Sequence, residues 1–455
     1  MKTHISRRSF LKTGSAAGAS LAFPTIIPAT ALGKGGRPAP SERITMACIG
    51  FGTIAHATGI SFLGDKRVQM VAVCDVNRRS KHYGYKGELE GGRDYGVEKV
   101  NEKYGNKDCM GYADFREVLA REDIDSLNVS TPDHWHSIMA IEGAKAGKHI
   151  YGQKPLSLTV AEGRAMSDAV NKAGITWQTG SQQRSSEHFR RGCELVRNGY
   201  IGKVKTVRVM LPGGHTNWSG LADEKDPAPV PAGFDWDMWQ GSAPEREFHP
   251  ALHPLCWRHN YDYSGGMVSD FGAHHFDIAQ WGLGTDDTGP LRFFNGKATL
   301  PPADALYNTA TDFHFEAEYA NGTHMIVDSI NMDDVGTGGV RFEGEDGKWI
   351  EVGRGVLKAS SDELRRTRLG PNDTPLYKST QHERNFIDCV YSGEATITPI
   401  ETSHRAITIA QVGNILLRLG KPELKWDPKT ESFPAAEKEA NAMLTRVMRA
   451  PWSIF

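Results

Sequence analysis

One glycine-rich turn constrains the fold of this chain more than any other feature. The short apolar run Ile44–Ile49 leads directly into Gly50-Phe51-Gly52-Thr53-Ile54-Ala55, which fits the pattern GxGxxA. A short, continuous apolar run suits a parallel strand that is buried on both faces. The two glycines allow a tight turn and a close approach of backbone N–H groups to an anion, and a small residue at Ala55 lets a helix pack on the strand. The sequence therefore predicts the strand, turn and helix that open a dinucleotide-binding fold.

A carboxylate at the end of the next predicted strand supports this interpretation. The apolar run Val68–Cys74 is followed by Asp75, about 20 residues beyond the glycines, where an acid binds the ribose hydroxyls of a bound dinucleotide. Such an acid repels a 2′-phosphate and favours NAD over NADP. NADP stays an alternative, because Arg78 and Arg79 could bind that phosphate. A glycine turn in an α/β fold without a nucleotide is the other alternative.

Strands and helices continue to alternate, which favours a doubly wound parallel sheet. In such a sheet, ligands bind beyond the carboxyl ends of the strands. The predicted order is a helix at 114–120, a strand at 126–130, a loop at Thr131–His136, a helix to Gly147, and a strand at His149–Tyr151 that runs into Gly152-Gln153-Lys154-Pro155. The segments that follow the last two strands therefore belong to the predicted ligand crevice.

The N-terminal segment is typical of a twin-arginine export signal. Arg7 and Arg8 precede an apolar run of small residues, Thr13–Ile27, that is too short and too rich in glycine and alanine for a permanent membrane span. We interpret residues 1–33 as the signal, with cleavage around Ala29–Ala31, and residues 34–42 as a linker. The expectation is export by the twin-arginine machinery to the periplasm, without a membrane anchor. An unstructured N-terminal arm is the alternative.

Composition excludes several other classes of protein. A chain of 455 residues suffices for two or three domains of about 100–200 residues. With 53 Lys and Arg against 55 Asp and Glu, the chain has no basic field to hold a nucleic acid. No CxxC pair occurs among the cysteines, which we interpret as free thiols. They are Cys48, Cys74, Cys109, Cys193, Cys256 and Cys389.

The order of several motifs resembles the glucose-fructose oxidoreductase / inositol dehydrogenase (Gfo/Idh/MocA) family. After the glycine turn and Asp75 come Thr-Pro-x-x-x-His at 131–136, Gly-Lys-His-Ile-Tyr-Gly-Gln-Lys-Pro at 147–155, Arg-Asn-Gly-Tyr-Ile-Gly-Lys-Val at 197–204, Gly265–His274, Pro399-Ile400-Glu401 and Arg405-Ala406. The resemblance thus covers nearly the whole chain after the signal. This chain departs from the family at Gln153, where members usually have glutamate before Lys-Pro.

The resemblance implies a Rossmann domain, which we place at 43–180, and an α/β domain with an open, mostly antiparallel sheet at 181–455. The second domain would hold the substrate and serve oligomerisation, so a homo-oligomer is expected. Carried over by position, Lys154, Asp270 and His274 are the expected catalytic residues. The expected cofactor-binding residues are Gly50, Phe51, Gly52, Thr53, Ile54, Asp75, Thr131, Pro132, His136, Gln153 and Lys154.

The spacing of the acid and the histidine has a physical rationale of its own. If Gly266–Gly282 is one helix, Asp270, His274 and Asp277 share a face, while His275 points about 100° away. A histidine oriented by a carboxylate can take the proton of a hydroxyl group. We therefore expect His274 to accept the proton and Asp270 to orient it. A solvated helix face is the alternative.

Lys154 is expected at a strand end, where its ammonium could polarise a substrate oxygen or relay a proton. With Gln153 in place of glutamate, one neighbouring negative charge is missing. The lysine could then be neutral more often, or its role could differ. A surface lysine in a turn is the alternative.

Aromatic and histidine side chains crowd the stretch before residue 265. Aromatic faces with interspersed donors suit the C–H faces and hydroxyls of a carbohydrate. Arg258, His259 and Tyr261 are the candidate substrate contacts. A metal site is the alternative, but His249, His253 and His259 follow no HExxH-like spacing, so no metal is predicted.

Three functions remain open at this stage. The first is an NAD(P)-dependent oxidoreductase that acts on a CH–OH group of a sugar, glycoside or polyol. The second is a nicotinamide-dependent glycoside hydrolase that works by transient oxidation, elimination and re-reduction. Because the twin-arginine route carries folded proteins, either enzyme would need a cofactor loaded before export and held tightly. The third is a sugar-binding or sensor protein with a dehydrogenase fold that has lost its catalytic activity. Only Gln153 supports this third function.

Overall fold

The computed structural model describes residues 38–84, 87–223, 226–254, 256–331 and 336–454. The chain divides into two units, residues 1–43 and 44–455. In the first unit the described part contains one short 3-10 helix, η3 (Pro40–Glu42). The predicted export signal and the first part of the predicted linker lie outside the described residues.

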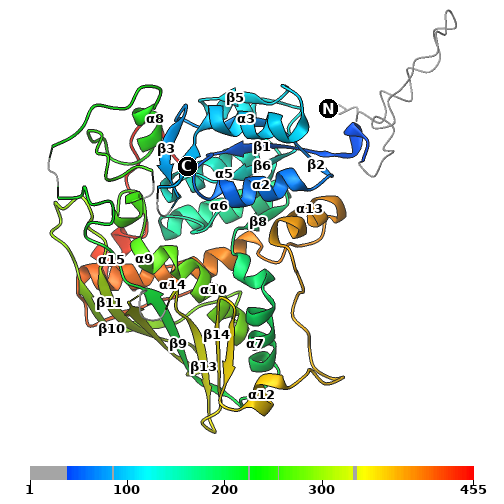
Figure 1. Ribbon diagram of the computed structural model, residues 1–455. Helices are drawn as coiled ribbons and strands as arrows, with labels where there is room; N and C mark the ends of the chain where they lie inside the picture. The colour runs from blue at the N-terminus through cyan, green and yellow to red at the C-terminus, as the bar shows by residue number, and fades with distance from the viewer. Residues whose placement is uncertain (1–37, 85–86, 224–225, 255, 332–335, 455) are drawn as a thin grey trace, which may run out of the picture. The chain divides into compact units, whose positions relative to one another are not determined.

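A six-stranded parallel sheet forms around the predicted glycine turn (Figure 1). Its order is β5-β2-β1-β6-β7-β8, the doubly wound arrangement expected from the sequence. The strands are β1 (Ile44–Ile49), β2 (Val68–Cys74), β5 (Met110–Tyr112), β6 (Ser126–Val129), β7 (His149–Gly152) and β8 (Trp177–Thr179). Ile49 is in register with Cys74 on one side and Val129 on the other, so three strands end at the same level. Gly50, Asp75 and Ser130 therefore follow at one edge of the sheet.

Helices connect these strands across both faces of the sheet. They are α2 (Ala55–Gly64), α3 (Arg93–Tyr104), α4 (Phe115–Leu119), α5 (Asp133–Lys145) and α6 (Val160–Ala173). The predicted loop Thr131–His136 is wrong in extent, because α5 already begins at Asp133. Pro132 caps this helix with an extended backbone, and an acidic residue in the first turn suits the positive end of the helix dipole. A small hairpin that the sequence did not predict, β3 (Ser80–Tyr83) with β4 (Leu89–Gly91), lies between β2 and α3.

A second sheet of eight strands follows, in the order β15-β14-β13-β9-β12-β11-β10-β16. Only β9 and β12 pair in parallel; the other pairs are antiparallel, as expected. Its strands are β9 (Val204–Pro212), β10 (Arg292–Thr299), β11 (Asp312–Glu318), β12 (His324–Ile330), β13 (Gly339–Gly344), β14 (Trp349–Gly353), β15 (Val356–Ala359) and β16 (Glu423–Lys425). The sheet is open, with β15 and β16 at its edges.

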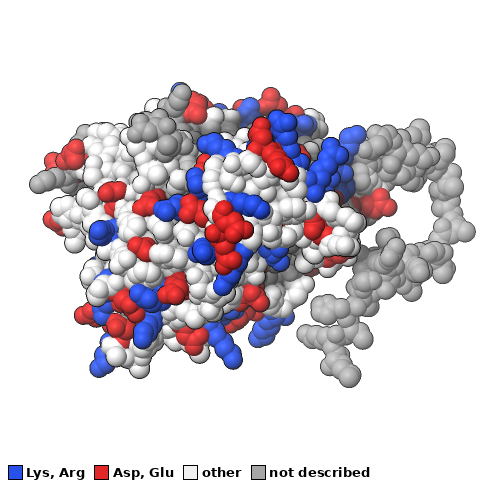
Figure 2. All heavy atoms as spheres, turned by 90° about the horizontal axis from the view of Figure 1, so that it is seen from below, with Lys and Arg blue, Asp and Glu red and all other residues white. Residues whose placement is uncertain are grey.

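Helices α7 (Glu187–Arg197), α10 (Gly272–Leu283) and α14 (Ile400–Leu419) cover one face of this sheet (Figure 1). Along β9 the side chains alternate, with Val207 and Val209 buried under the helices and Arg208 exposed on the other face. Arg208 pairs there with Glu343 on β13. Figure 2 shows acidic and basic side chains interspersed over the molecule seen from below.

The predicted helix Gly266–Gly282 is two helices, α9 (Gly266–Asp270) and α10, separated by Phe271. The backbone N–H of His274 bonds to the carbonyl of Phe271, one residue closer than in a regular α-helix. The carbonyl of Asp270 instead accepts a hydrogen bond of 3.2 Å from Nζ of Lys154. The lysine therefore takes the place of a helical N–H at this break.

Shorter elements complete the second unit. They are η4 (Gln182–Ser185), α8 (Trp236–Gln240), η5 (Cys256–His259), α12 (Asp362–Arg366), α13 (His382–Ser392) and α15 (Lys438–Ala442). No helix in the described part of the chain has the length and apolar character needed to cross a bilayer.

Candidate functional site

The glycine turn is shaped to admit a phosphate group. Gly50 has φ +82°, and a Cβ at this position would lie 2.7 Å from the carbonyl oxygen of Ser130. Only glycine fits such a position without strain. The turn therefore brings β1 close to the end of β6 and leaves the N-terminal end of α2 open to a ligand, as a dinucleotide site requires.

Asp75 connects this turn to the end of β2 through hydrogen bonds. Its carboxylate accepts hydrogen bonds of 2.8 Å from the backbone N–H of Phe51 and of Asn77. Burial raises the pKa of Asp75 to about 6, although these two hydrogen bonds and the charge of Arg93 oppose the change. Asp75 thus joins the end of β2 to the glycine turn and also lines the adjoining crevice.

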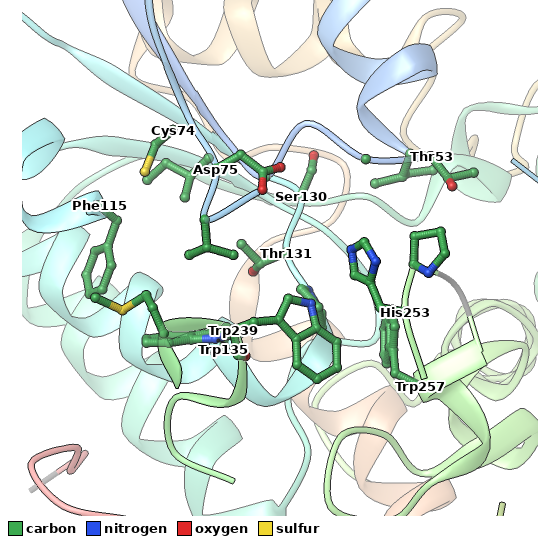
Figure 3. A pocket seen from close by; sticks show the side chains of 18 of the residues that line it. Thr53, Cys74, Asp75, Phe115, Ser130, Thr131, Trp135, Trp239, His253 and Trp257 are labelled. Carbon is green, nitrogen blue, oxygen red and sulfur yellow. Dashed lines mark hydrogen bonds between the residues drawn. The ribbon is translucent and has the colours of Figure 1, made fainter. Parts of the chain in front are cut away.

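A crevice runs from the glycine turn across the strand ends (Figure 3). Seven of the predicted cofactor-binding residues line it: Gly50, Gly52, Thr53, Ile54, Asp75, Thr131 and Pro132. Phe51, His136, Gln153 and Lys154 are not in its lining. The glycine turn, the strand-end carboxylate and the apolar walls together fit a dinucleotide.

The opposite wall of the crevice comes from the described parts of residues 213–264, which we call the cover segment. It contributes Met238, Trp239, His253, Pro254, Trp257 and Arg258 (Figure 3). Backbone hydrogen bonds attach it to the end of β2, from Arg78 to Gly233 at 2.8 Å and from Asp235 to Val76 at 3.1 Å. Side chains from the aromatic stretch thus face the dinucleotide crevice.

Tyr83 is a crevice residue that the sequence did not reveal. It comes from the β3–β4 hairpin, and its ring would lie 3.0 Å from a Cβ at Gly52. Its hydroxyl is 3.1 Å from Nε2 of His253 in the cover segment. The hairpin has no strong periodic pattern, so only the tertiary contact identifies this tyrosine.

Lys154 and Asp270 form an ion pair at the end of β7. Nζ of Lys154 lies 2.5 Å from Oδ1 of Asp270, and their side chains are 15% and 10% exposed. Nε of Arg258 is 3.5 Å from the same oxygen. Burial alone would raise the pKa of Asp270, but the charges of Lys154 and Arg258 outweigh it and hold that pKa well below its ordinary value. The hydrogen-bond partner of the carboxylate is Lys154 rather than His274.

His274 lies one turn beyond Asp270 and is buried. Its Nδ1 has no hydrogen-bond partner within the described residues. Burial, together with the positive charges of Lys154 and Arg354, holds the pKa of His274 well below its ordinary value. The ring is therefore neutral at ordinary pH and able to accept a proton.

Asp277 and His275, the other two residues named in the predicted helix, make contacts within the scaffold. Asp277 is buried and accepts a hydrogen bond of 2.8 Å from Nε of Arg184. His275 points to the second sheet, where its Nδ1 is 3.0 Å from the carbonyl of Met210. Neither lies with Lys154 and Asp270.

The three candidate substrate contacts separate in space. Arg258 lies beside Asp270 and lines the crevice. His259 is fully buried against Trp218 and Tyr307, and neither ring nitrogen has a partner within the described residues. Tyr261 lies under the guanidinium of Arg418, in a different cavity. The structure thus brings Arg258 to the ion pair and leaves Tyr261 apart from it.

His136 and Gln153 lie outside the crevice lining. Nδ1 of His136 is 2.7 Å from the carbonyl of Pro155, and its Nε2 is 2.9 Å from the carbonyl of Thr131. The histidine therefore links the loops after β6 and β7. Gln153 is buried, with both amide atoms unpartnered among the described residues.

All six cysteines are free thiols, as predicted. Cys48 and Cys74 are buried in β1 and β2. Within the described residues no group of three or more His, Cys, Asp or Glu side chains is placed to hold a metal ion.

Comparisons with known proteins agree with this architecture. Residues 44–181 match the NAD-binding Rossmann fold of an oxidoreductase family, Gfo/Idh/MocA, and residues 189–454 match its C-terminal alpha/beta domain. Residues 4–24 match the TAT (twin-arginine translocation) pathway signal sequence.

Among curated proteins, the myo-inositol 2-dehydrogenase of Thermotoga maritima is 27% identical over 240 residues, 52% of this chain and 54% of that protein. A glycosyl hydrolase family 109 protein of Shewanella baltica is 31% identical over 219 residues, 45% of this chain and 42% of that protein. The chain spans about half the length of the curated relatives it matches.

Solved structures share the fold over most of the chain. The aldose-aldose oxidoreductase of Caulobacter crescentus, complexed with glycerol, has a TM-score of 0.59 at 19% identity and covers 84% of this chain and 99% of its own. The WlbA dehydrogenase of Bordetella pertussis, in complex with NADH and UDP-GlcNAcA, has a TM-score of 0.59 at 15% identity, over 85% and 99%. At these identities the likeness shows the fold alone. Because the two domain models together match nearly all of the chain after residue 43, the chain belongs to the Gfo/Idh/MocA oxidoreductase family.

Proposed function

We propose that this protein is an NAD-dependent oxidoreductase that oxidises a CH–OH group of a sugar, glycoside or polyol. The observation that carries the proposal is the Lys154–Asp270 ion pair with neutral His274, next to a crevice shaped for a dinucleotide. A relative in the same family is a polyol dehydrogenase by name. The combination of a hydride-acceptor site and a nearby proton acceptor suits dehydrogenation.

The residues divide the work as follows. A bound nicotinamide supplies the hydride acceptor. Lys154, fixed by Asp270, donates a hydrogen bond to the substrate oxygen, and His274 takes the hydroxyl proton as the C–H bond is broken. Asp270 therefore positions Lys154, and the neutral histidine is left free to act as the base.

The choice of NAD rests on the surroundings of Asp75. Arg78 pairs with Asp94 at 2.7 Å, and Arg79 pairs with Glu90 and Glu98 at 2.8 and 2.9 Å. Neither arginine lines the crevice. A 2′-phosphate would thus meet the Asp75 carboxylate at the strand end, with neither Arg78 nor Arg79 in the crevice lining to bind it.

We propose that the cofactor stays bound through export to the periplasm. The cover segment closes the side of the crevice that faces the glycine turn, and the N-terminus matches a twin-arginine signal. Replacing Arg7 and Arg8 with Lys should leave the precursor in the cytoplasm. We also propose a homo-oligomer built on the open sheet face, which size-exclusion chromatography with light scattering would test.

A nicotinamide-dependent glycosidase is the second candidate, because a relative at 31% identity is a glycosyl hydrolase family 109 protein. In that cycle the hydride returns to the sugar after elimination and water addition. A tightly held cofactor suits such a closed cycle as well as it suits a dehydrogenase.

One experiment separates the two candidates. The mature protein is purified without added cofactor and denatured, and any released nicotinamide is identified and quantified. The native protein is then incubated with a panel of glycosides and assayed for oxidised sugar and free aglycone. Oxidised sugar with reduced cofactor would establish the dehydrogenase, whereas aglycone release without net reduction would establish the glycosidase. An empty protein would contradict the proposal of a preloaded cofactor.

A further inference from the structure

We propose that the substrate is an anionic glycan. A carboxylate or sulfate next to its reacting carbinol binds Arg354, and further anionic sugar residues of the glycan lie along an adjoining groove lined by arginines. The inference rests on the proposed function and adds the substrate class.

Arg354 stands at the turn between β14 and β15, in Gly353-Arg354-Gly355. Its side chain is exposed, and no carboxylate pairs with it in the described part of the chain. Its Cζ lies 5.3 Å from the ring centroid of Phe271, whose ring in turn lies 6.4 Å from that of His274. A cation that no described carboxylate pairs with therefore lies against Phe271, whose ring neighbours His274, and its charge lowers the pKa of His274.

The carboxylates around the proposed reaction centre pair with groups other than Arg354. Asp270 is engaged by Lys154 at 2.5 Å and by Arg258 at 3.5 Å. Asp133, the other buried carboxylate nearby, accepts a hydrogen bond of 2.6 Å from the Ser264 hydroxyl. Both acids face the cations of the interior and neither pairs with Arg354, so its guanidinium is available to a carboxylate or sulfate of the ligand. Guanidinium groups bind carboxylate and sulfate with two parallel hydrogen bonds.

A groove of about 690 Å³ begins beside Arg354, at Gly355. Four arginines and one carboxylate are among its lining residues, which are Glu187, His188, Arg191, Gly355, Leu357, Arg365, Arg366 and Arg368. This excess of positive charge is local, because the whole chain has a net charge of −2. A groove of this composition favours a ligand with several negative charges.

Three arginines of this groove, from two separate segments of the chain, make contacts with neighbouring residues. Arg191 on α7 donates hydrogen bonds of 3.1 and 2.9 Å to the carbonyls of Arg365 and Thr367, so its charge is not neutralised by a carboxylate. Arg365 and Arg366 share one exposed carboxylate, Asp362, at 3.1 and 3.4 Å. Exposed ion pairs of this kind contribute only about 0–1 kcal/mol, so an incoming anion can replace Asp362.

The groove and the reaction centre belong to one framework. Glu187, at one end of the groove, begins α7 directly after η4. Arg184 of η4 bonds to Asp277 on α10, the helix that carries His274. The groove next to Arg354 is therefore joined through η4 to the helix that carries His274, and the proposed glycan would extend from His274 past Arg354 along this groove.

The test uses the mature protein with NAD and matched pairs of ligands: methyl glucosides, galactosides and mannosides, each against the corresponding methyl uronide. Binding is measured by calorimetry, with inorganic sulfate as a probe for unspecific anion binding. In at least one pair the uronide should bind about tenfold more tightly, and an oligouronide should bind more tightly still. R354Q should reduce the preference to less than about twofold, and R354K should retain part of it. R341Q, which removes an arginine of the open sheet face, should leave the preference unchanged.

Separate readouts distinguish failure of this inference from failure of the proposed function. Neutral glycosides that bind as tightly as uronides in every pair, or a preference that survives in R354Q, would overturn the anionic substrate. Turnover of neutral glycosides under those results would leave the oxidoreductase intact. Selective uronide binding without oxidation or aglycone release would support the anion site and count against the proposed reaction. Equal competition by sulfate at every site would show an adventitious anion only and refute the inference.

Discussion

The two ends of the crevice are built in different ways. At the dinucleotide end, Gly50, Phe51 and Asp75 come from one strand-turn-helix unit and the strand beside it, and backbone N–H groups make the contacts. At the catalytic end, Lys154 and Asp270 come from distant segments, and an ion pair of side chains joins them. The dinucleotide end is a local structure that binds the cofactor, whereas the catalytic end depends on the packing of helix α9 against the end of β7.

This difference predicts that variants separate into two classes. Changes at the dinucleotide end should alter cofactor content, and changes at the catalytic end should alter turnover while the cofactor stays.

The largest effect is expected for His274→Ala. Loss of the proton acceptor should lower kcat by about 10²–10⁴-fold, the usual contribution of a positioned base. Released nicotinamide per subunit should match the unchanged protein. His314→Ala, on the open face of the second sheet, is the control and should keep full turnover. Turnover that persists in His274→Ala would remove this residue from the mechanism.

Breaking the ion pair should come next. Asp270→Asn leaves the Lys154 ammonium without its counter-ion in a site that is mostly buried, and should lower the free energy of unfolding by about 3 kcal/mol. The double variant Lys154→Met with Asp270→Asn should lose less than the sum of the two single variants, because the Lys154 ammonium is then no longer buried without its partner. Urea unfolding of all four proteins measures this coupling. Strictly additive losses would show that the pair does not join the two segments energetically.

The same contrast explains how much the sequence could predict. The strands Ile44–Ile49 and Val68–Cys74 were predicted with the bounds that the structure has, because buried parallel strands are short apolar runs. Asp75 was predicted to bind a ribose from its distance along the chain after the glycines, and the structure places it in the crevice lining beside the glycine turn. These features are local, so local patterns are sufficient to find them.

Features that depend on distant contacts were missed. The break at Phe271 follows from Lys154, which takes the carbonyl of Asp270 from across the molecule. Tyr83 and Arg354 lie in short hairpins, where a tyrosine or a glycine-flanked arginine looks like an ordinary surface residue. The side chains of the cover segment were recognised as a group, but only the fold shows that Trp239, His253 and Trp257 face the dinucleotide crevice.

A glycine substitution tests the dinucleotide end. Gly50→Ala places a methyl group 2.7 Å from the Ser130 carbonyl at φ +82°, which should cost about 1–3 kcal/mol of stability and displace the turn. The purified variant should therefore contain little nicotinamide. Gly64→Ala is the matched control, because nothing lies within 4 Å of its Cβ and it ends a helix of the same unit. Full cofactor content in Gly50→Ala would mean that the turn does not hold the phosphates.

The smallest effect expected is a shift in the pH dependence of turnover. The pKa of His274 is depressed by burial and by the charges of Lys154 and Arg354, so its neutral, proton-accepting form persists as the pH falls below 6.5. The acid limb of kcat/KM should thus lie below the ordinary titration range of histidine. Removing the positive charge in R354Q raises the pKa of His274, so the acid limb of kcat/KM should move to higher pH. The assay uses a neutral glycoside as substrate, so that binding of an anion to Arg354 plays no part. A limb that does not move would show that Arg354 is too well screened to act on His274, and would weaken the link between the catalytic end of the crevice and the arginine groove.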